Sequence, residues 1–231
     1  MTTILLTGST RGIGAACHDA LTAAGARVIG HGTRSGIAAD LSDPVAPQRL
    51  WAAALAQADG RIDVLVNNAG VFEASPLAGD HDAWVAGWER TMRINLTAAA
   101  ELSRLAVLHW QEGNGGRLVN VASRAAYRGD SPQHWHYAAS KAGMVAMTKT
   151  IARGYAAEGV LAFAVCPGFT MTGMAEDYLA SRGGDKLLAD IPLGRVADPA
   201  EGADVVRFCA LDAPASMTGA VLDVNGASYV R

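Results

Sequence analysis

Short apolar runs alternate with longer segments of helical composition along the whole chain. The apolar runs have the length of buried strands, and the segments between them are long enough to form helices. Strands are expected at residues 4–6, 27–31, 62–66, 116–122, 160–165 and 220–224, and helices at 15–24, 44–57, 81–111, around 137–141 and at 200–210. This alternation predicts an α/β fold with one open, mainly parallel sheet that carries helices on both faces.

Length and composition favour one domain that spans residues 1–231. Half of the 231 residues are hydrophobic, and we find no linker, repeat or low-complexity segment that would divide the chain. The net charge of −3 and the lack of a Lys/Arg run argue against a nucleic-acid partner or a membrane surface. The amino terminus lacks the charged and apolar regions of an export signal, so a cytoplasmic protein is expected.

The three cysteines give no sign of a metal site or a disulfide framework. Cys17, Cys166 and Cys209 lie far apart, without a C-x-x-C motif or a histidine cluster at ligand spacing. We therefore expect core thiols in a reducing compartment, and no metal ion.

Glycines follow the first expected strand in a pattern that suits a bound phosphate. Gly8, Gly12 and Gly14 lie in the turn that leads into the first expected helix. Glycines let the backbone approach a pyrophosphate, and the start of a helix offers unpaired N–H groups to the anion. The spacing is neither G-x-G-x-x-G nor the G-x-x-x-x-G-K phosphate loop, so an ordinary turn is the alternative.

The loop after the second expected strand favours NADP(H) over NAD(H). An acidic residue there would bind the ribose hydroxyls of NAD, whereas basic and hydroxyl groups suit the additional phosphate of NADP. Residues 29–39 contain no Asp or Glu but include Thr33 and Arg34, and Arg11 lies in the glycine turn. The alternative is that Arg34 simply extends into solvent.

Tyr137 and Lys141 form the most informative pair in the sequence. Residues four apart on a helix lie one turn apart on the same face, so the ammonium can lie beside the phenol. A phenol titrates near about 10, and a fixed cation can offset part of the cost of ionising it at neutral pH. Taken alone, the pair could equally be a solvated helix face. Two polar residues accompany it: Ser123 after the strand at 116–122, and Asn95 within a helix, where a buried amide needs partners.

Together these residues resemble the short-chain dehydrogenase/reductase family over essentially the whole chain. The resemblance rests on motifs in the family's order and near its spacing: Thr7-Gly8-x-x-x-Gly12-x-Gly14, Asp40-Leu41, Asn67-Asn68-Ala69-Gly70, Asn95, Ser123, Tyr137-x-x-x-Lys141 and Pro167-Gly168-x-x-x-Thr172. It implies a Rossmann-type, doubly wound parallel sheet. It also implies an NAD(P)-dependent oxidoreductase that acts on a small carbonyl or secondary alcohol and assembles as a homotetramer or homodimer.

The resemblance also implies roles for individual residues. Tyr137 would exchange a proton with the substrate oxygen, and Ser123 would hydrogen-bond that oxygen. Lys141 would hold the nicotinamide ribose and favour the tyrosinate, and Asn95 would anchor a water in a proton relay. The expected coenzyme contacts are Gly8, Thr10, Arg11, Gly12, Ile13, Gly14, Thr33, Arg34, Asp40, Leu41, Asn68, Ala69, Gly70, Tyr137, Lys141, Pro167, Gly168, Thr170 and Thr172.

Three segments need separate comment. The loop between Ser123 and Tyr137 is slightly longer than is usual in the family and unusually polar and aromatic. We hypothesise that Arg124, Arg128 or His134 meets a polar or anionic group of the substrate, while a solvated loop or a subunit contact is the simpler interpretation. The stretch after the second strand is contracted, which leaves the register of the coenzyme loop open. Residues 173–193 have weak periodicity and are expected to form a substrate lid.

Two alternative functions stay open. Val28-Ile29-Gly30-x-x-x-Thr33 suggests a 3-oxoacyl-carrier-protein reductase, although the polar loop before Tyr137 does not favour it. A catalytically silent nucleotide-sensing protein is an alternative from a different class, but such proteins typically lose the tyrosine or the lysine, and here all four catalytic positions are filled. A Ser/His hydrolase is disfavoured because Ser123 lies outside any G-x-S-x-G elbow.

Overall fold

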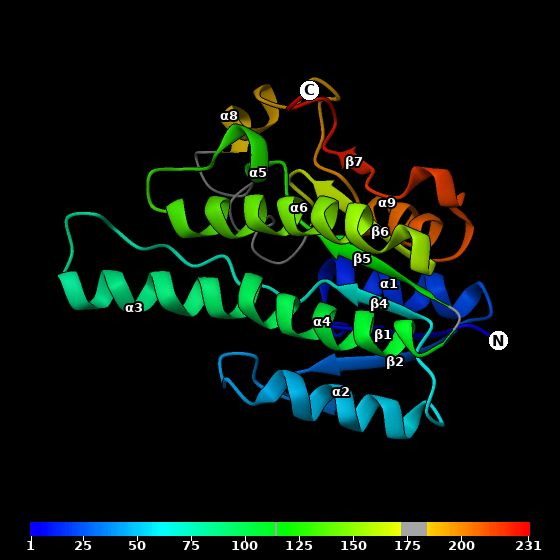
Figure 1. Ribbon diagram of the computed structural model, residues 1–231. Helices are drawn as coiled ribbons and strands as arrows, with labels where there is room; N and C mark the ends of the chain where they lie inside the picture. The colour runs from blue at the N-terminus through cyan, green and yellow to red at the C-terminus, as the bar shows by residue number, and fades with distance from the viewer. Residues whose placement is uncertain (114, 172–183) are drawn as a thin grey trace.

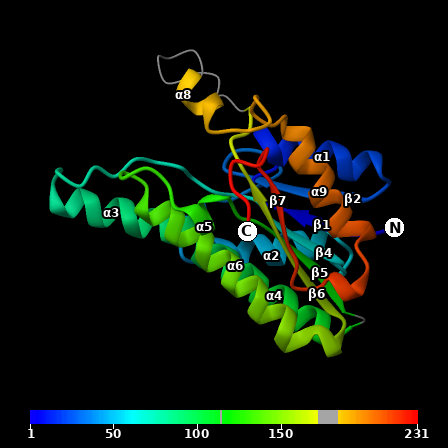
Figure 2. The same ribbon diagram turned by 90° about the horizontal axis from the view of Figure 1, so that it is seen from above.

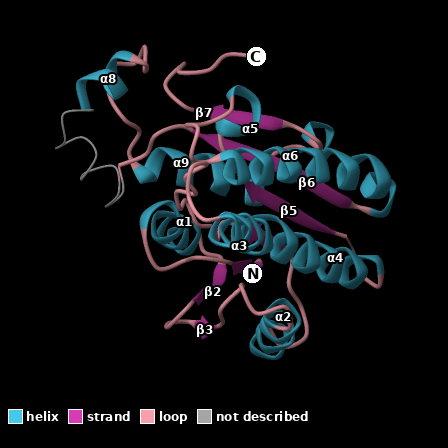
Figure 3. Cartoon of the chain, turned by 90° about the vertical axis from the view of Figure 1, so that its left-hand side faces the viewer, coloured by secondary structure: helices cyan, strands magenta, loops and turns pink. Residues whose placement is uncertain are grey.

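Parallel strands form one continuous sheet in the computed structural model (Figure 1), which describes residues 1–113, 115–171 and 184–231. The strands follow the order β3-β2-β1-β4-β5-β6-β7. Figure 3 shows β2 and β3 toward one edge and β7 toward the other. The bounds are β1 Thr3–Leu6, β2 Arg27–Gly32, β3 Ile37–Ala38, β4 Val64–Asn67, β5 Gly116–Val121, β6 Val160–Pro167 and β7 Val221–Val224. The prediction of a doubly wound, Rossmann-type α/β fold is confirmed.

Helices cover both faces of the sheet (Figure 2). Successive side chains of a strand point to opposite faces of the sheet, so the two faces have separate cores. In β1, Ile4 and Leu6 pack with α1 and α9, whereas Leu5 packs with α2, α4 and α6. The α-helices are α1 Gly12–Ala23, α2 Ala46–Gln57, α3 His81–Met92, α4 Ala98–Gln111, α5 Ala125–Arg128, α6 Trp135–Tyr155, α8 Gly184–Ala189 and α9 Pro199–Arg207. Shorter turns are the π-helical Arg93–Thr97 and Phe208–Asp212 and the 3-10 turns Ala156–Glu158 and Ala215–Met217.

The expected elements are present with small shifts in their bounds. The strand expected at 62–66 begins at Val64, and the carbonyl of Ile62 accepts instead from Trp110 Nε1 at 2.8 Å. β3, which the sequence did not indicate, forms where the contracted segment pairs with the edge of β2. The helix expected at 81–111 is interrupted by the π-helical turn Arg93–Thr97. The alternation of apolar runs and helical segments therefore predicts the order of strands and helices, but it does not predict irregular turns within helices.

The expected lid falls mostly outside the described residues, which exclude 172–183. In the described remainder, Ile191 is buried and packs with Val196. The N–H of Leu193 donates to the carbonyl of Gly226 at 3.2 Å, so this part of the segment is tied to the turn after β7. A lid at 173–193 stays a prediction.

A chain of buried polar side chains ties the middle of the sheet to two helices. Asn67 on β4 and Asn120 on β5 are register partners, and Asn67 Nδ2 donates to Asn120 Oδ1 at 2.9 Å. Asn67 Nδ2 also donates to Ser103 Oγ on α4 at 3.0 Å, and Asn120 Nδ2 donates to Thr148 Oγ1 on α6 at 2.8 Å. We call these four residues the polar clamp. Because all four are buried, their hydrogen bonds fix α4 and α6 against the strand ends.

His31 joins the end of β2 to the turn after β1. Its ring is buried; Nδ1 accepts from the Gly8 N–H at 3.2 Å, and Nε2 donates to the Ala39 carbonyl at 3.0 Å. These partners require a neutral ring with its proton on Nε2. Burial lowers the pKa of His31, although the bond to Ala39 acts in the opposite direction.

Three further observations concern the chain as a whole. Cys17, Cys166 and Cys209 are buried free thiols, as expected for core residues. Within the described residues, no helix is long and apolar enough to cross a bilayer. The same part of the chain brings together no group of three or more His, Cys, Asp or Glu residues that could hold a metal ion.

Replacing Thr148 with valine should destabilise the fold, because Asn120 Nδ2 would lose its acceptor in a buried setting. We expect the free energy of unfolding to fall by about 1–3 kcal/mol, measured by urea denaturation followed by circular dichroism. Thr150→Val is the matched control, since the Thr150 hydroxyl also bonds a carbonyl one turn back but is exposed. Equal losses in the two variants would show that the polar clamp adds nothing to stability.

His31 should make the fold less stable at mildly acidic pH. His31 binds a proton near about pH 6.5 in the unfolded chain and only at a lower pH in the folded chain. The stability that neutral His31 contributes to the fold is therefore fully present above about pH 6.5 and is lost as the pH falls below it. Burial also lowers the pKa of His134 and His136, so wild type and His31→Gln must be compared. When the pH falls from about 7.5 to 5.5, the free energy of unfolding should decrease in both proteins. The decrease should be smaller in the variant than in wild type, by up to about 1.4 kcal/mol. His18→Gln, at an exposed histidine, should behave as wild type; a His31→Gln profile parallel to both would refute the assignment.

Candidate active site

The loops that carry the expected site meet at one edge of the sheet. Because the strands are parallel, the segments after β1, β4, β5 and β6 leave the sheet on the same side. The strand order changes direction between β1 and β4, the position at which sheets of this type bind ligands. The structure thus brings together the glycine turn, residues 67–70, Ser123 and Pro167-Gly168.

Close contacts in the glycine turn require Gly8 and Gly14. Gly8 has a φ of +67°, and a Cβ there would lie 2.8 Å from Ala69 Cα. A Cβ on Gly14 would lie 1.9 Å from the Gly8 carbonyl oxygen and 2.5 Å from Asn68 Nδ2. Asn68 Nδ2 in turn donates to the carbonyls of Thr7 and Gly8 at 3.1 and 3.0 Å. The turn is therefore packed directly against the segment after β4, and neither position can carry a larger side chain without moving the backbone.

The start of α1 fits a pyrophosphate. The N-cap residue Arg11 is extended and makes no side-chain capping bond, and the first turn of α1 contains no acidic residue. The N–H groups at Gly12, Ile13 and Gly14 therefore begin a 12-residue helix whose dipole favours an anion. The coenzyme contacts expected in this turn stay a prediction that this geometry supports.

The glycine turn and the loop after β2 each present one arginine to solvent. Thr10, Arg11, Thr33 and Arg34 are all exposed. A Cβ on Gly32 would lie 2.6 Å from Thr10 Cγ2, so the glycine turn rests against the end of β2. Arg11 and Arg34 therefore lie exposed on two neighbouring segments, the glycine turn and the loop after β2.

Asp40 and Leu41 are placed differently from each other. The Asp40 carboxylate is exposed and accepts from the N–H and the hydroxyl of Ser42 at 2.9 and 2.8 Å, and these bonds lower its pKa. The Leu41 side chain is buried in the core between α2 and the sheet. A coenzyme contact from Leu41 would therefore have to use its backbone.

Asn95 lies in the π-helical turn Arg93–Thr97 and is completely buried. Its Oδ1 accepts from the Val71 N–H at 2.8 Å and its Nδ2 donates to the Val71 carbonyl at 2.9 Å. The side-chain amide thus bonds both backbone groups of Val71, as the backbone of a neighbouring strand would. Nδ2 also reaches Ser140 Oγ on α6 at 3.3 Å. A Cβ on Gly70 would lie 3.3 Å from Asn95 Oδ1 and 3.6 Å from Lys141 Nζ. Asn95 therefore holds the segment after β4 close to Lys141, and the π-helical turn is of the kind that often accompanies functional sites.

Tyr137 and Ser123 meet, although 14 positions separate them in the sequence. The Ser123 hydroxyl hydrogen-bonds the Tyr137 phenol, and Ser123 Oγ also accepts from the Ala125 N–H at 3.1 Å. Burial of the phenol outweighs this bond and raises the pKa of Tyr137 to about 12. The Phe72 ring lies edge-on to the Tyr137 ring, with centroids 4.8 Å apart.

Lys141 lies one turn beyond Tyr137 on α6, with Nζ 5.7 Å from the centre of the tyrosine ring. Its ammonium donates to the Val121 carbonyl at 2.8 Å, at the end of β5. Burial lowers the pKa of Lys141 to about 8. Desolvation is the largest cause of both pKa shifts in the chain alone, and the expectation that the cation offsets part of the cost of ionising the phenol stays a prediction.

One segment with expected coenzyme contacts follows β6. The Gly168 N–H donates to the Val224 carbonyl at 2.9 Å, and a Cβ on Gly168 would lie 2.8 Å from Asn225 Cα. Thr170 is buried, with its hydroxyl 3.3 Å from the Gly168 carbonyl. Pro167, Gly168 and Thr170 therefore lie beside the ends of β5 and β7, whereas Thr172 falls outside the described residues.

Two of the three residues proposed to meet the substrate are engaged elsewhere. Arg128 Nη1 pairs with Asp190 Oδ2 at 2.6 Å and donates to the Ser228 carbonyl at 3.2 Å. The His134 ring stacks on Phe72 with centroids 3.9 Å apart, and Nδ1 lies 2.6 Å from Ser131 Oγ. Arg124 differs from both, because its side chain is buried and its guanidinium lies over the Phe169 ring, 4.8 Å from the centroid.

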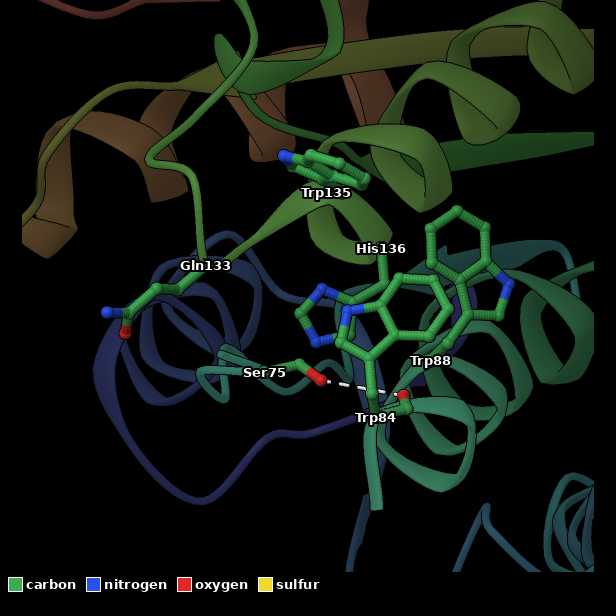
Figure 4. A pocket seen from close by; sticks show the side chains of 6 residues that line it. All are labelled: Ser75, Trp84, Trp88, Gln133, Trp135 and His136. Atoms are coloured by element: carbon green, nitrogen blue, oxygen red, sulfur yellow. Dashed lines mark hydrogen bonds between the residues drawn. The ribbon is translucent and has the colours of Figure 1, made fainter. Parts of the chain in front are cut away.

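Aromatic side chains surround a narrow pocket on the α3 side of Tyr137 (Figure 4). The Trp84 and Trp88 rings stack with centroids 5.6 Å apart, and His136 lies against Trp88 at 6.4 Å. His136 Nε2 is buried without a hydrogen-bond partner among the described residues. The pocket is lined by Ser75, Trp84, Trp88, Gln133, Trp135 and His136. None of these residues was predicted as part of the site.

Two positioning residues were also missed from the sequence. The Thr7 hydroxyl accepts from the N–H groups of Asn68 and Ala69 at 3.0 Å each, which joins the ends of β1 and β4. His31 holds Gly8 from the other side. The alternation of β2 could have identified His31, because it shares a face with the buried Ile29 and so had to find polar partners.

Comparison with known proteins finds relatives of this chain over almost its whole length. A family model described as enoyl-(acyl carrier protein) reductase matches residues 8–227. The chain is 35% identical over 241 residues to the 3-oxoacyl-(acyl-carrier-protein) reductase FabG of Vibrio cholerae. This alignment covers 98% of this chain and 96% of the relative. It is 32% identical over 245 residues to FabG of Escherichia coli, again with 98% and 96% coverage.

Solved structures agree with the sequence relatives. A structure from Agrobacterium tumefaciens, described as a candidate gluconate dehydrogenase, superimposes with a TM-score of 0.90 at 26% identity, covering 100% of this chain and 97% of that one. A structure from Beutenbergia cavernae, described as a candidate NAD(P)-dependent gluconate 5-dehydrogenase with NADP bound at low occupancy, gives a TM-score of 0.89 at 32% identity, with 97% and 95% coverage.

The family model, the full-length relatives and the geometry of Ser123, Tyr137 and Lys141 therefore agree. The chain belongs to the short-chain dehydrogenase/reductase family and is an NAD(P)-dependent oxidoreductase.

Proposed function

We propose that this oxidoreductase transfers a hydride between NADP(H) and a small carbonyl or secondary alcohol, with Tyr137 as the acid and base. The observation that carries the proposal is the meeting of the Ser123 hydroxyl with the Tyr137 phenol, one helical turn from the buried Lys141. NADPH supplies the hydride when bound. The protein's own part is to hold the substrate oxygen and to move one proton.

The proton step follows from the environment of the phenol. Ser123 would donate a hydrogen bond to the substrate oxygen, and Tyr137 would give its proton to that oxygen as negative charge develops there. Burial raises the pKa of Tyr137 to about 12, so the phenol is protonated at neutral pH and ready to donate. Lys141 would bind the nicotinamide ribose and stabilise the tyrosinate left behind, and Asn95 would order a water next to it.

The preference for NADP(H) is supported by the surface around α1. Arg11 and Arg34 are exposed beside the glycine turn, and Thr33 precedes Arg34 in the loop after β2. A phosphate on the adenosine ribose would find two guanidinium groups there, and charge-assisted bonds to phosphate are strong. The binding of NADP in the Beutenbergia cavernae relative is consistent with this choice.

A second candidate function is the reduction of a 3-oxoacyl group on a carrier protein. The relatives from Vibrio cholerae and Escherichia coli, which are 3-oxoacyl-(acyl-carrier-protein) reductases, favour it. A silent nucleotide sensor is not favoured, because Asn95, Ser123, Tyr137 and Lys141 are all present and the last three lie close together.

Assembly and location are proposed on the same basis. The long helices α4 and α6 cover one face of the sheet, and Leu108 on α4 is 44% exposed. A homotetramer or homodimer formed through these helices and the last strand would cover such side chains. A cytoplasmic location, with no nucleic-acid or membrane partner, completes the proposal.

Tyr137→Phe should abolish turnover without abolishing coenzyme binding. Removing the acid from the proton step should lower kcat by about 10²–10⁴-fold, while the affinity for NADPH stays within a few-fold. Ethyl 3-oxobutanoate reduction, followed by NADPH absorbance, measures the first quantity, and fluorescence titration measures the second. Tyr155→Phe at the end of the same helix is the control. A Tyr137→Phe enzyme as fast as the control would remove Tyr137 from the mechanism.

Arg11→Ala or Arg34→Ala should weaken NADPH binding selectively. Loss of a charge-assisted bond to the ribose phosphate predicts a rise in the Kd for NADPH of roughly 10- to 100-fold, and little change for NADH. Fluorescence titration of wild type and both variants with each coenzyme measures the two constants, with Arg104→Ala on the exposed side of α4 as the control. Tighter binding of NADH by the wild type would reverse the assignment of the coenzyme.

A further inference from the structure

Arg124 carries a buried positive charge that is only partly paired. Its side chain is 9% exposed, and its nearest carboxylate oxygen is Asp190 Oδ2, 3.5 Å from Nη1. Nη1 is enclosed and makes no hydrogen bond within the residues that the structure describes. Buried guanidinium groups are normally held by hydrogen bonds, so this one has donor capacity left for a ligand.

The carboxylate nearest to Arg124 is already occupied. Asp190 Oδ2 lies 2.6 Å from Arg128 Nη1, and this bond lowers the pKa of Asp190. Asp130 adds a weaker attraction to Arg124, but its carboxylate already accepts from the Ser131 N–H at 2.7 Å. Two guanidinium groups therefore share the Asp190 carboxylate, and the surplus charge lies on the buried member of the pair.

Arg124 is also fixed at the reacting end of the site. It follows Ser123 directly in the sequence, and its N–H donates to the Pro167 carbonyl at 2.9 Å. Its guanidinium lies over Phe169, two residues beyond Pro167 in a segment expected to contact the coenzyme. Arg124 is thus next in sequence to the residue that would bind the substrate oxygen, and it contacts the segment after β6 through both its backbone and its side chain.

The helix that carries Arg124 is held firmly in place. Arg128 at its other end bonds Asp190 and the Ser228 carbonyl. On the same short helix, the Tyr127 hydroxyl accepts from Arg231 Nη1 at 3.0 Å, and Arg231 pairs with Asp223 at 2.9 Å. A guanidinium on a fixed support is pre-organised for a planar partner, which favours a carboxylate bound through two parallel bonds.

We infer that Arg124 binds a carboxylate of the substrate, and that the enzyme acts on oxo acids or hydroxy acids whose carboxylate lies a few atoms from the reacting carbon. The inference rests on the proposed function, since it uses Ser123 and Tyr137 as the place of the reacting oxygen. It makes Arg124 a specificity-determining residue. A thioester on a carrier protein has no carboxylate at this position, so the inference separates this enzyme from a 3-oxoacyl-carrier-protein reductase.

Matched acid and neutral compounds test the inference. The pairs are 2-oxobutanoate and its ethyl ester, 3-oxobutanoate and its ethyl ester, and D-gluconate and D-glucitol. For at least one pair, kcat/KM of the wild type should be about tenfold or more higher for the acid. Arg124→Gln should remove this preference, mainly through a higher KM for the acid, and leave the neutral partner within a few-fold. Arg124→Lys, which keeps the charge but not the planar fork, should retain part of the preference.

Arg153→Gln is the control, because it removes one positive charge from the exposed far end of α6. It should keep the acid preference of the wild type. Circular dichroism melting of each variant checks that the fold is intact. If no pair shows an acid preference in the wild type, or if Arg124→Gln retains the preference, the inference is overturned.

Binding without turnover separates this inference from the proposed function. Calorimetric titration of 3-hydroxybutanoate and of its ethyl ester into the protein–NADPH complex measures the same acid preference when no hydride can move. A preference that depends on Arg124, in an enzyme that reduces none of the carbonyl compounds, would overturn the proposed function and support the carboxylate site. Reduction of the esters alone, with no preference for acids in either assay, would overturn the carboxylate site and leave the proposed function standing.

Discussion

The hydrogen bond between the side chains of Asn67 and Asn120 fixes the two strand ends on which the site depends. Thr148 continues this link to α6, and Lys141, seven residues earlier on the same helix, donates to the carbonyl of Val121, the neighbour of Asn120. Helix α6 is therefore bonded to two consecutive residues of β5. Since Tyr137 lies one turn before Lys141, its distance from Ser123 at the end of β5 follows from these bonds. Lys141 is a structural support as well as a cation, and this explains why a lysine whose burial lowers its pKa is kept in place.

The coenzyme side of the site is held by a separate set of contacts on the same strand ends. Asn68, next to Asn67, donates to the carbonyls that precede and begin the glycine turn, and Thr7 receives two N–H groups from the segment after β4. His31 holds Gly8 from the side of β2. The turn is therefore clamped between β2 and β4, and its free N–H groups keep one orientation. The two halves of the site share β4, so the place of the pyrophosphate and the place of the proton donor are set by one element.

The sequence predicted the layers of the fold and the residues at the ends of the strands, because hydrophobic periodicity and parallel topology together determine which loops meet. It did not predict β3 or the polar clamp. The bond from Asn67 to Asn120 spans 53 positions, and periodicity tells which face a residue occupies but not which partner it finds across the sheet. The same limit explains Arg124, Arg128 and His134. All three look alike in a polar loop, and only the position of Asp190 shows that Arg128 makes the shorter ion pair, at 2.6 Å, while Arg124 lies 3.5 Å from the same carboxylate oxygen.

Two buried cations, Lys141 and Arg124, stand at the end of β5, and burial lowers the pKa of both. Such charges are costly unless a ligand or a neighbour completes their bonds. Burial raises the pKa of the Tyr137 phenol to about 12, and the phenol would become negative on giving up its proton, a charge that Lys141 would stabilise. A substrate that brings its own carboxylate would oppose this step, since a second negative charge nearby disfavours the tyrosinate. If Arg124 pairs with that carboxylate, the substrate's charge is neutralised before the proton moves, and Lys141 is left to stabilise the tyrosinate. In this chain, Arg124 is the buried cation placed to take that role for an acidic substrate.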